Sequence, residues 1–574
     1  MSTRIVIIGG VAAGPKTACR VKRLLPEAQV TIIDQDTLIS YGGCGIPYYV
    51  SGDVSDEQEL RATSFHMVRD ERFFHDAKGV ETLTATCATA IDRKQKEVLV
   101  RNVTTGKEDR IPYDKLVLAT GSRPNVLPIP GTDLQGVFVI SDMHQAIAIK
   151  ARLAKGEVGK AVVIGGGAIG IEMAEAFTDL WGVETTLIEF MDQLLPNLLD
   201  RPFAGMLAQH MRDKGVTIYT GEGAQRLEAG DQGQVCRVVT AKRTLDADLV
   251  VMAAGVRPRD ELARSAGLLV GPRGGIVVNN RLQTSDPDIY AAGDCVEVTS
   301  LVSGRKCYAP LGSIANRQGR VVADNLAGIF STFEGVVGSF IMKAFEVCVG
   351  ATGLTLDSAR REGFDAAAVI TAQSDRAHFF PQQAIMPLQM VFDRRSRRVL
   401  GVQGFGPMGD GVLARIDAAA ALLSKGGTID DFSKLEMAYA PPFSTALDAL
   451  NATANVADNL AAGRLRYCSI DDFQAWMRDA AVAPDWMALD VRHPKEVQPF
   501  LDTYGDRWLS IPYDQVRSRY REIPAGKQLI IICDACTRSY EIQSFLDSVG
   551  CTNTLGLGGG FNVIRRLKPD WWPK

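Results

Sequence analysis

Short apolar runs recur along the first half of the chain, and two of them lead directly into glycine-rich turns. Residues 4–8 read RIVII and residues 161–164 read AVVI, and a helical pattern follows each turn. Continuous apolar runs of this length are typical of buried parallel strands whose two faces are covered by helices. The repeated order of strand, turn and helix predicts an α/β fold.

The first glycine-rich turn predicts a dinucleotide site. It extends from Gly9 to Gly14, with Val11 in the place of the middle glycine, and the next strand ends at Asp34. Glycines let the backbone approach a pyrophosphate closely, and the N-terminus of the following helix attracts its negative charge. The Asp34 carboxylate is placed to accept a hydrogen bond from a ribose hydroxyl.

The second turn repeats this pattern with all three glycines. Gly165, Gly167 and Gly170 follow the apolar strand, and the next strand ends at Glu189. A carboxylate here accepts hydrogen bonds from a ribose and repels a 2′-phosphate, so NADH is favoured over NADPH. Two dinucleotide folds in one chain predict a flavin and a nicotinamide between which a hydride passes.

Length and charge narrow the class of protein. At roughly 150 residues per domain, the 574 residues correspond to about four domains. The 63 basic and 67 acidic residues nearly balance, so nucleic acid is not expected as a partner. No apolar run approaches the roughly 18 residues of a membrane span, so no membrane partner is expected. Eleven scattered cysteines favour a reducing, cytoplasmic location, and no metal site is predicted.

Three further strings support the pair of dinucleotide folds: the first two each place a buried strand before a glycine turn, and the third ends in an aspartate. Residues 116–124 read LVLATGSRP, residues 249–258 read LVVMAAGVRP and residues 284–294 read TSDPDIYAAGD. Together with the two turns, they resemble the FAD-dependent pyridine nucleotide-disulfide oxidoreductases. This resemblance implies that Asp294 bonds the ribityl or phosphate side of FAD. The other cofactor contacts expected in these strings are Ala119, Thr120, Gly121, Arg123 and Gly255.

A single cysteine follows the first α/β unit. Residues 40–50 read SYGGCGIPYYV, in which Cys44 stands alone and Tyr49 occupies the second position of a C-x4-C pair. A lone thiol stores its oxidised state as a sulfenic acid or as a mixed disulfide with a small thiol. The string resembles the active loop of coenzyme A disulfide reductases, although Gly43 replaces an asparagine and Gly42 replaces an alanine.

This resemblance implies coenzyme A as a ligand. Several phosphates require several cations, and Lys16, Arg20 and Arg23 lie on one face of the first predicted helix. The corresponding helix of the coenzyme A disulfide reductases cradles the nucleotide, whereas a solvated helix face is the alternative interpretation. Ser40 and Tyr41 of the cysteine loop are further expected contacts.

The resemblance also implies a homodimer. In relatives a tyrosine of the partner subunit approaches the active cysteine, and Tyr439 in the string YAPPFS holds this position. Its phenol is suited to steady or protonate a departing thiolate. A second tyrosine that relatives often carry is absent from the run Phe379-Phe380-Pro381.

The last hundred residues form another α/β pattern. The string MALDVRHPKEV and the strand before Cys533 resemble rhodanese, or sulfurtransferase, domains. The loop from Cys533 to Arg538 has six residues, the size that accompanies sulfane sulfur in this family. N–H groups around such a thiol stabilise its thiolate or persulfide. Cys536 replaces the usual glycine and creates C-x-x-C, so a dithiol redox site is the alternative.

These observations predict two Rossmann-like dinucleotide-binding domains, an α+β dimerisation domain and a C-terminal α/β rhodanese domain. The expected boundaries are 1–112 with 256–330 for FAD binding, 113–255 for NAD binding, 331–451 for dimerisation, 452–467 for a linker and 468–574 for the rhodanese domain.

The predicted activity is NADH-dependent reduction of coenzyme A persulfide, polysulfide or coenzyme A disulfide through Cys44, with FAD as cofactor and sulfane sulfur handled by Cys533. An NADH oxidase or peroxidase that uses a Cys44 sulfenate is the alternative enzyme. A non-catalytic sulfur carrier or redox sensor is the alternative from another class.

Overall fold

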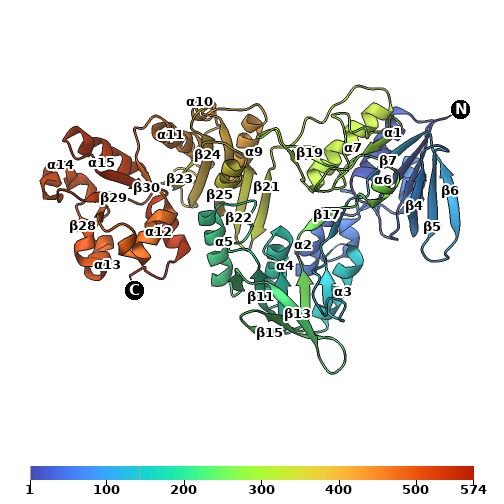
Figure 1. Cartoon of the computed structure of the whole chain (residues 1–574), viewed down its shortest axis with the longest axis horizontal. Coiled ribbons are helices and arrows are strands. Elements are labelled where there is room, and N and C mark those ends of the chain that lie inside the picture. The colour runs from blue at the N-terminus through green and yellow to red at the C-terminus, as the bar shows by residue number, and fades with distance from the viewer. Residues whose placement is uncertain (1, 141, 574) are drawn as a thin grey trace. The chain divides into compact units, whose positions relative to one another are not determined.

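The computed structural model describes residues 2–140 and 142–573, and the chain divides into two compact units (Figure 1). Unit 1 comprises residues 1–190 and 215–336, and unit 2 comprises residues 191–214 and 337–574. Both glycine turns therefore belong to unit 1. No helix among the described residues combines the length and apolar character that a membrane crossing requires.

The first sheet of unit 1 is parallel and has the strand order β18-β7-β1-β2-β3. Its central strands are apolar runs because both faces of a parallel sheet are covered. Helix α1 packs against β1 and β2, and α7 packs against α1. The bounds are Arg4–Ile8 for β1, Gln29–Ile33 for β2, Glu81–Leu83 for β3, Lys115–Leu118 for β7, Ile289–Ala291 for β18, Ala13–Leu24 for α1 and Gly312–Leu326 for α7.

The second parallel sheet of unit 1 has the order β12-β11-β10-β16-β9, and α4 packs against its centre. The bounds are Val137–Val139 for β9, Lys160–Ile164 for β10, Glu184–Glu189 for β11, Thr217–Thr220 for β12, Leu249–Met252 for β16, Met143–Ala154 for α3 and Ala168–Asp179 for α4.

Unit 1 also contains two three-stranded antiparallel sheets, β4-β5-β6 and β13-β14-β15. Their bounds are Thr86–Asp92 for β4, Glu97–Asn102 for β5, Glu108–Pro112 for β6, Ala224–Ala229 for β13, Val235–Thr240 for β14 and Thr244–Asp246 for β15.

The chain passes between the two parallel sheets later than the expected boundary at residue 113. Strand β7 (Lys115–Leu118) pairs with β1 and therefore belongs to the first sheet. The crossing lies at β8 (Ser122–Pro124), which pairs antiparallel with the returning strand β17 (Val256–Pro258). The apolar run of β7 does not by itself reveal which sheet it joins.

Unit 2 begins with an antiparallel sheet of order β21-β22-β25-β24-β23. Helix α9 packs on β22 and β25, and α11 packs on β23 and β24. The bounds are Phe340–Ala344 for β21, Val347–Gly353 for β22, Ala366–Ser374 for β23, Ile385–Asp393 for β24, Val399–Pro407 for β25, Arg201–Asp213 for α5, Leu356–Arg361 for α8, Asp410–Leu423 for α9, Ile429–Ser433 for α10 and Ala449–Ala461 for α11.

The C-terminal part of unit 2 is a parallel sheet of order β26-β30-β29-β27-β28. The bounds are Tyr467–Cys468 for β26, Trp486–Asp490 for β27, Trp508–Ser510 for β28, Gln528–Ile532 for β29, Thr554–Leu557 for β30, Ile470–Arg478 for α12, Pro494–Tyr504 for α13, Val516–Arg519 for α14, Thr537–Ser548 for α15 and Gly560–Leu567 for α16.

The expected linker over 452–467 differs from the structure. Residues 449–461 form α11, and Ala454 and Ala457 on this helix are completely buried in the core of the antiparallel domain. Only Ala462, Gly463 and Arg464 are exposed between α11 and β26. The passage between the two domains is therefore about one turn of chain.

Candidate active site and cofactor cradles

The first glycine turn is a close-packed backbone cradle. A Cβ at Gly14 would lie 1.9 Å from the Gly9 carbonyl oxygen, and a Cβ at Gly9 would lie 2.0 Å from the Ala119 carbonyl oxygen. Glycine is therefore required for β1 to turn directly into α1. The Asp34 carboxylate accepts a hydrogen bond from the Gly10 N–H at 2.6 Å, and burial raises the pKa of Asp34. Asp34 thus braces the turn from the position predicted for ribose contact.

Asp294 lies beside this cradle. It follows Gly293, where a Cβ would come within 3.2 Å of the Cβ of Ala13, the first residue of α1. The Ser122 hydroxyl donates to the Asp294 carboxylate at 3.2 Å, and burial raises the pKa of Asp294. A turn without side chains, a helix N-terminus and two carboxylates fit the pyrophosphate and the hydroxyl-bearing chain of FAD.

The second predicted FAD segment leaves the sheet after β7. The Thr120 hydroxyl donates to the Arg259 carbonyl oxygen at 2.7 Å, Gly121 adopts a φ of +69°, and Arg123 forms an ion pair with Glu261. These contacts fix the crossing between the two sheets. Direct contact of Thr120, Gly121 and Arg123 with FAD stays a prediction.

The second turn reproduces the geometry of the first. A Cβ at Gly170 would again lie 1.9 Å from the carbonyl oxygen of the first glycine, Gly165, whereas a Cβ at Gly167 would meet open space. The Glu189 carboxylate, which is 9% exposed, accepts from the Gly166 N–H at 2.5 Å. The equal close approach in both turns supports the prediction of two dinucleotide folds.

The end of β16 closes the second cradle. A Cβ at Gly165 would lie 2.4 Å from the Ala253 carbonyl oxygen. Gly255 adopts a φ of +82° and accepts a hydrogen bond from the Asn125 N–H at 2.9 Å. Gly255 lies two residues beyond Ala253, the residue that meets this cradle, and its contact with a cofactor stays a prediction.

Cys44 is exposed and lies on a single 3-10 turn, Gly43–Gly45, that leads into α2 (Ile46–Ser51). A Cβ at Gly312, the first residue of α7, would be 3.6 Å from its Sγ. The thiol thus faces the N-terminus of a long helix, where N–H groups favour an anion. Burial raises the pKa of Cys44, and the charges of Glu172 and Asp294 raise it further, while the Gly312 N–H lowers it.

Glu172 is a residue that the sequence interpretation missed. It lies on α4, and burial together with Glu175 raises its pKa to about 7. This acid acts on the Cys44 thiol through its charge. The signal in the sequence is a pair of glutamates on a mostly apolar helix, but nothing local connects them with a cysteine more than a hundred residues earlier.

The position of the absent second cysteine is filled by a structural aromatic residue. Tyr49 is 7% exposed, and the Lys150 ammonium lies 3.9 Å from the centre of its ring. This buried contact gives Tyr49 a packing role.

The expected coenzyme A contacts separate into two groups. Arg20 forms a largely buried ion pair with Asp324 of α7 at 2.5 Å, so its charge is already neutralised and it joins two helices. Ser40 is 3% exposed, and its N–H donates to the Gly10 carbonyl oxygen at 2.7 Å. Arg20 and Ser40 therefore have structural contacts of their own, and their contact with coenzyme A stays a prediction. The half-buried Tyr41 ring lies beside Gly43 in the cysteine loop.

Lys16 and Arg23 of α1 form a basic cluster with two residues that the sequence interpretation missed, Arg69 and Lys78. Lys16 and Arg23 are exposed, and both act electrostatically on the half-buried Cys19 thiol, as do Arg69 and Lys78. These four side chains therefore lie within electrostatic reach of one point on α1. Such a cluster is suited to a ligand with several phosphates.

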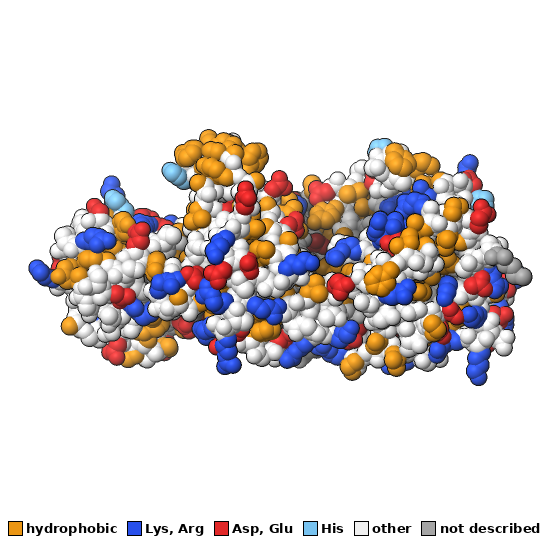
Figure 2. Space-filling model, turned by 90° about the horizontal axis from the view of Figure 1, so that it is seen from above, with side chains coloured by type: hydrophobic (Ala, Val, Ile, Leu, Met, Phe, Trp, Pro, Cys, Tyr) orange, Lys and Arg blue, Asp and Glu red, His pale blue; other side chains and the backbone are white. Residues whose placement is uncertain are grey.

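Tyr439 lies in unit 2, on a loop after α10 (Ile429–Ser433), and is 51% exposed. Phe379 and Phe443 are also exposed, and the Ala377 N–H donates to the Pro441 carbonyl oxygen, which ties the two aromatic loops together. Figure 2 shows a projecting lobe rich in hydrophobic side chains over the antiparallel domain. Exposed aromatic residues in such number are typical of an interface.

The Cys533 loop is the second thiol site. Cys533 is 1% exposed at the end of β29, and its Sγ accepts a hydrogen bond from the Cys536 N–H at 3.1 Å. The Ser539 hydroxyl lies 3.7 Å from the same sulfur, and α15 begins at Thr537. Cys536 has a φ of +74°, a conformation that favours glycine, and burial raises its pKa to about 12.

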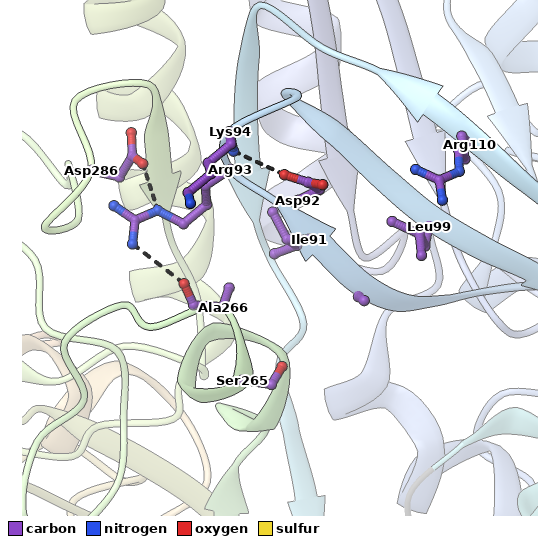
Figure 3. A pocket seen from close by; sticks show the side chains of 10 residues that line it. Ile91, Asp92, Arg93, Lys94, Leu99, Arg110, Ser265, Ala266 and Asp286 are labelled. Atoms are coloured by element: carbon purple, nitrogen blue, oxygen red, sulfur yellow. Dashed lines mark hydrogen bonds and ion pairs between the residues drawn. The ribbon is translucent and has the colours of Figure 1, made fainter.

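A surface hollow lies elsewhere in unit 1. Its volume is about 710 Å³. Figure 3 shows its lining residues on the β4–β5 hairpin and at the end of α6 (Glu261–Ser265). The Arg93 guanidinium that lines it donates to Asp286 at 2.7 Å and to the Ala266 carbonyl oxygen at 3.3 Å. None of the predicted site residues lines this hollow.

The paired cradles, with a thiol beside the first, define an oxidoreductase that binds two dinucleotides. Residues 3–319 match the family described as Pyridine nucleotide-disulphide oxidoreductase, and residues 341–450 match the dimerisation domain of that family. The chain belongs to this family and is an FAD-dependent oxidoreductase that uses a nicotinamide cofactor.

Two curated relatives are similar to this chain over about four fifths of its length. The chain is 36% identical over 456 residues to the NAD(P)H coenzyme A polysulfide/persulfide reductase of Pyrococcus horikoshii, with 79% of this chain and 98% of the relative covered. It is 32% identical over 461 residues to an NADH oxidase of Enterococcus faecalis, with 79% and 99% covered.

Two solved structures match nearly the entire chain. The NAD-dependent persulfide reductase from A. fulgidus has a TM-score of 0.91 and 38% identity, with 98% of this chain and 99% of that chain covered. The reduced CoADR-RHD of Bacillus anthracis has a TM-score of 0.91 and 31% identity, with 99% of both chains covered. The predicted family and the predicted fold class, including the C-terminal rhodanese domain, are confirmed.

Proposed function

We propose that the protein reduces coenzyme A persulfide, polysulfide or coenzyme A disulfide with NADH, through Cys44, and that Cys533 carries the sulfane sulfur. The observation that carries this proposal is the exposed Cys44 thiol at the N-terminus of α7, next to a dinucleotide cradle, in a chain with a second thiol loop. The relatives named as persulfide reductases support it.

The sulfur chemistry follows from a single thiol. The Cys44 thiolate attacks the inner sulfur of coenzyme A persulfide, sulfide leaves, and Cys44 holds coenzyme A as a mixed disulfide. Two electrons and one proton then return Cys44 to its thiolate and release the coenzyme A thiol. FAD, when bound, supplies the transfer of these two electrons from NADH.

The chain's own groups control the charge of the thiol. The N–H of Gly312 favours the Cys44 thiolate, whereas the carboxylates of Glu172 and Asp294 oppose it. In a homodimer we place Tyr439 of one subunit at the Cys44 site of the other, where its phenol donates a proton to the departing thiolate.

The basic cluster is the proposed binding site for the phosphates of the thiol ligand, coenzyme A. Lys16 and Arg23 present their charges on the surface of α1, and Arg69 and Lys78 lie close enough to act on the same thiol of that helix. We assign these four cations to the phosphates of coenzyme A, with Tyr41 on the side of the cysteine loop.

The two glycine turns provide the proposed binding residues for the two dinucleotides. We assign FAD to the turn from Gly9 to Gly14 with Asp34 and Asp294, and NADH to the turn after Gly165 with Glu189. The Rossmann geometry of both turns supports this assignment.

The second candidate activity is reduction of oxygen or peroxide through a Cys44 sulfenate. It is favoured by the 32% identity to an NADH oxidase. The rhodanese domain favours sulfur chemistry, because oxygen reduction has no use for a sulfane-sulfur carrier.

One experiment separates these activities from each other and from a non-catalytic carrier. NADH oxidation by the purified protein is compared with coenzyme A persulfide, coenzyme A disulfide, polysulfide and oxygen as acceptors, the first three without oxygen. We expect a yellow protein that NADH bleaches and that turns over fastest with the persulfide. Fastest turnover with oxygen contradicts the proposal, and a colourless, unreactive protein favours the carrier.

A further inference from the structure

The arginines around Cys533 form ion pairs with carboxylates, although the site is proposed to handle anionic sulfur. The residue directly after the nucleophile, Asp534, forms an ion pair with Arg538, the last residue of the active loop. The other Asp534 oxygen lies 3.4 Å from the Arg565 guanidinium, and Arg565 also contacts Glu496 at 2.7 Å. Both guanidiniums at the loop are therefore already matched by carboxylates.

Pairing of this kind changes which donor the loop accepts. Within the loop, the Cys536 N–H donates to the Cys533 sulfur. A guanidinium without a partner would bind a second negative charge strongly, since hydrogen bonds between ions are about twice as strong as neutral ones. A guanidinium that is already paired with Asp534 attracts a second negative charge much less, and the Asp534 carboxylate itself repels a dianion.

We propose that Asp534 makes the Cys533 loop selective for the persulfide of an organic thiol over thiosulfate. This inference rests on the proposed sulfur-carrying role of Cys533. A thiol persulfide carries one negative charge and leaves as a thiolate with one charge. Thiosulfate carries two, and both remain on the departing sulfite.

The transfer step is the same exchange for either donor. The Cys533 thiolate attacks the outer sulfur of R–S–S⁻, the S–S bond of the donor breaks, and a new S–S bond forms at Cys533. The products are Cys533–S–S⁻ and R–S⁻, which takes a proton from water. With thiosulfate the products are Cys533–S–S⁻ and sulfite, so neither donor requires an oxidant or a reductant.

The test measures sulfur loading of Cys533 in the full-length, FAD-loaded protein without NADH. Pantetheine persulfide, whose chain is uncharged, is compared with thiosulfate, and loading is followed as the mass gain of one sulfur atom on the peptide that contains Cys533. The unmodified protein is expected to load sulfur from the persulfide at least about tenfold faster than from thiosulfate. A tenfold difference corresponds to the free energy of about one hydrogen bond to a charged group.

Two variants test the residue itself. Asp534→Asn, which frees Arg538 and leaves Arg565 paired with Glu496, is expected to raise the thiosulfate-to-persulfide ratio about tenfold. Asp534→Glu, which keeps the charge, is expected to keep the original ratio. Glu522→Gln is the matched control, because it removes one negative charge from an exposed ion pair with Arg519 in the same domain.

Equal loading from both donors in the unmodified protein overturns the inference, and this measurement stands even if a variant does not fold. An unchanged ratio in folded Asp534→Asn, or an equal rise in Glu522→Gln, overturns it as well. Because loading needs no NADH, failure of the proposed reductase activity is seen separately, as absent NADH oxidation in a protein that still loads selectively.

Discussion

Glu172 sets a pH dependence on the Cys44 thiol. The pKa of Glu172 is raised to about 7, so the side chain is neutral below that pH and negative above it. Its negative charge raises the pKa of Cys44. Glu172→Gln is therefore expected to lower the Cys44 pKa, and the pH profile of Cys44 alkylation by iodoacetamide should move to lower pH.

Asp179→Asn, on the exposed end of the same helix, is the control and should leave the profile in place. An unmoved profile in Glu172→Gln contradicts this coupling.

Glu189 is expected to decide between the two nicotinamide cofactors. Its carboxylate is fixed by the Gly166 N–H at 2.5 Å, which holds it at the end of β11. Glu189→Gln keeps the size of the side chain but loses the charge that ribose hydroxyls bond, a loss of about 1.5–3 kcal/mol. The kcat/KM for NADH should fall more than that for NADPH, as steady-state kinetics with both cofactors would measure. Equal kinetics for both in the unmodified protein would contradict the assignment.

Cys44→Ser isolates the thiol from the cofactors. The variant is expected to bind FAD and to be bleached by NADH, because neither cradle uses the sulfur, yet to show no NADH-dependent disulfide reduction. Retained turnover with coenzyme A disulfide would remove Cys44 from the mechanism.

The sequence predicts Cys44 and Cys533 because the loops that carry them resemble the active loops of known families. It does not reveal Glu172 or Gly312, whose part in the Cys44 site depends on helices from distant segments. For Arg20, the basic stripe on its own helix predicts a ligand contact. The sequence does not reveal its ion pair with Asp324, because that partner comes from the distant helix α7.

Among the elements, α9 carries the clamp that holds the aromatic loops of unit 2. The Arg415 guanidinium, on a residue 3% exposed, contacts Asp448 at 2.6 Å and also bonds Ser444 and the Asp375 carbonyl oxygen. Breaking a buried ion pair leaves one charge without a partner and destabilises a protein by about 3–5 kcal/mol. Arg415→Met should lower the free energy of unfolding by this amount in denaturant titration. Arg360→Met, on an exposed position of α8, is the control, and equal effects of the two changes would contradict the clamp.

The strand–turn–helix units could be predicted because their glycine chemistry is local. Helix α11 could not, because its buried face consists of small residues such as Ala454 and Ala457, which give little hydrophobic contrast. The place of β7 also escaped prediction, because an apolar run does not reveal its pairing partner.

At the scale of the whole molecule, the rhodanese domain is docked on the antiparallel domain of unit 2 rather than tethered. The Tyr467 hydroxyl accepts from the Ile370 N–H at 2.9 Å, the Gly559 N–H donates to the Ile370 carbonyl oxygen at 2.9 Å, and the Asn562 amide donates to Ala372. These bonds cover the free edge of β23, which would otherwise pair with other chains. Both domains are therefore expected to unfold in one transition.

Tyr467→Phe tests this docking. It leaves the Ile370 N–H without its acceptor, so stability should fall by about 1–3 kcal/mol and trypsin should cut faster after the exposed Arg464. Thermal unfolding and timed proteolysis measure these effects. Tyr513→Phe, which removes a hydroxyl bonded to Glu541 on the rhodanese surface, is the control. Unchanged cleavage in Tyr467→Phe contradicts the docking.

The fusion of the two thiol sites makes its own prediction. Cys533→Ser is expected to lose sulfur loading and the turnover that depends on a sulfane donor, while coenzyme A disulfide reduction, which needs Cys44 alone, continues. Cys536→Gly should leave sulfur transfer largely intact, because glycine readily adopts the φ of +74° found at this position and keeps the N–H that bonds the Cys533 sulfur. Both activities are measured in each variant by anaerobic NADH oxidation with coenzyme A disulfide and with polysulfide. If Cys536→Gly abolishes activity as fully as Cys533→Ser, the two cysteines act as a dithiol pair, and the assignment of Cys533 as a sulfane carrier is wrong.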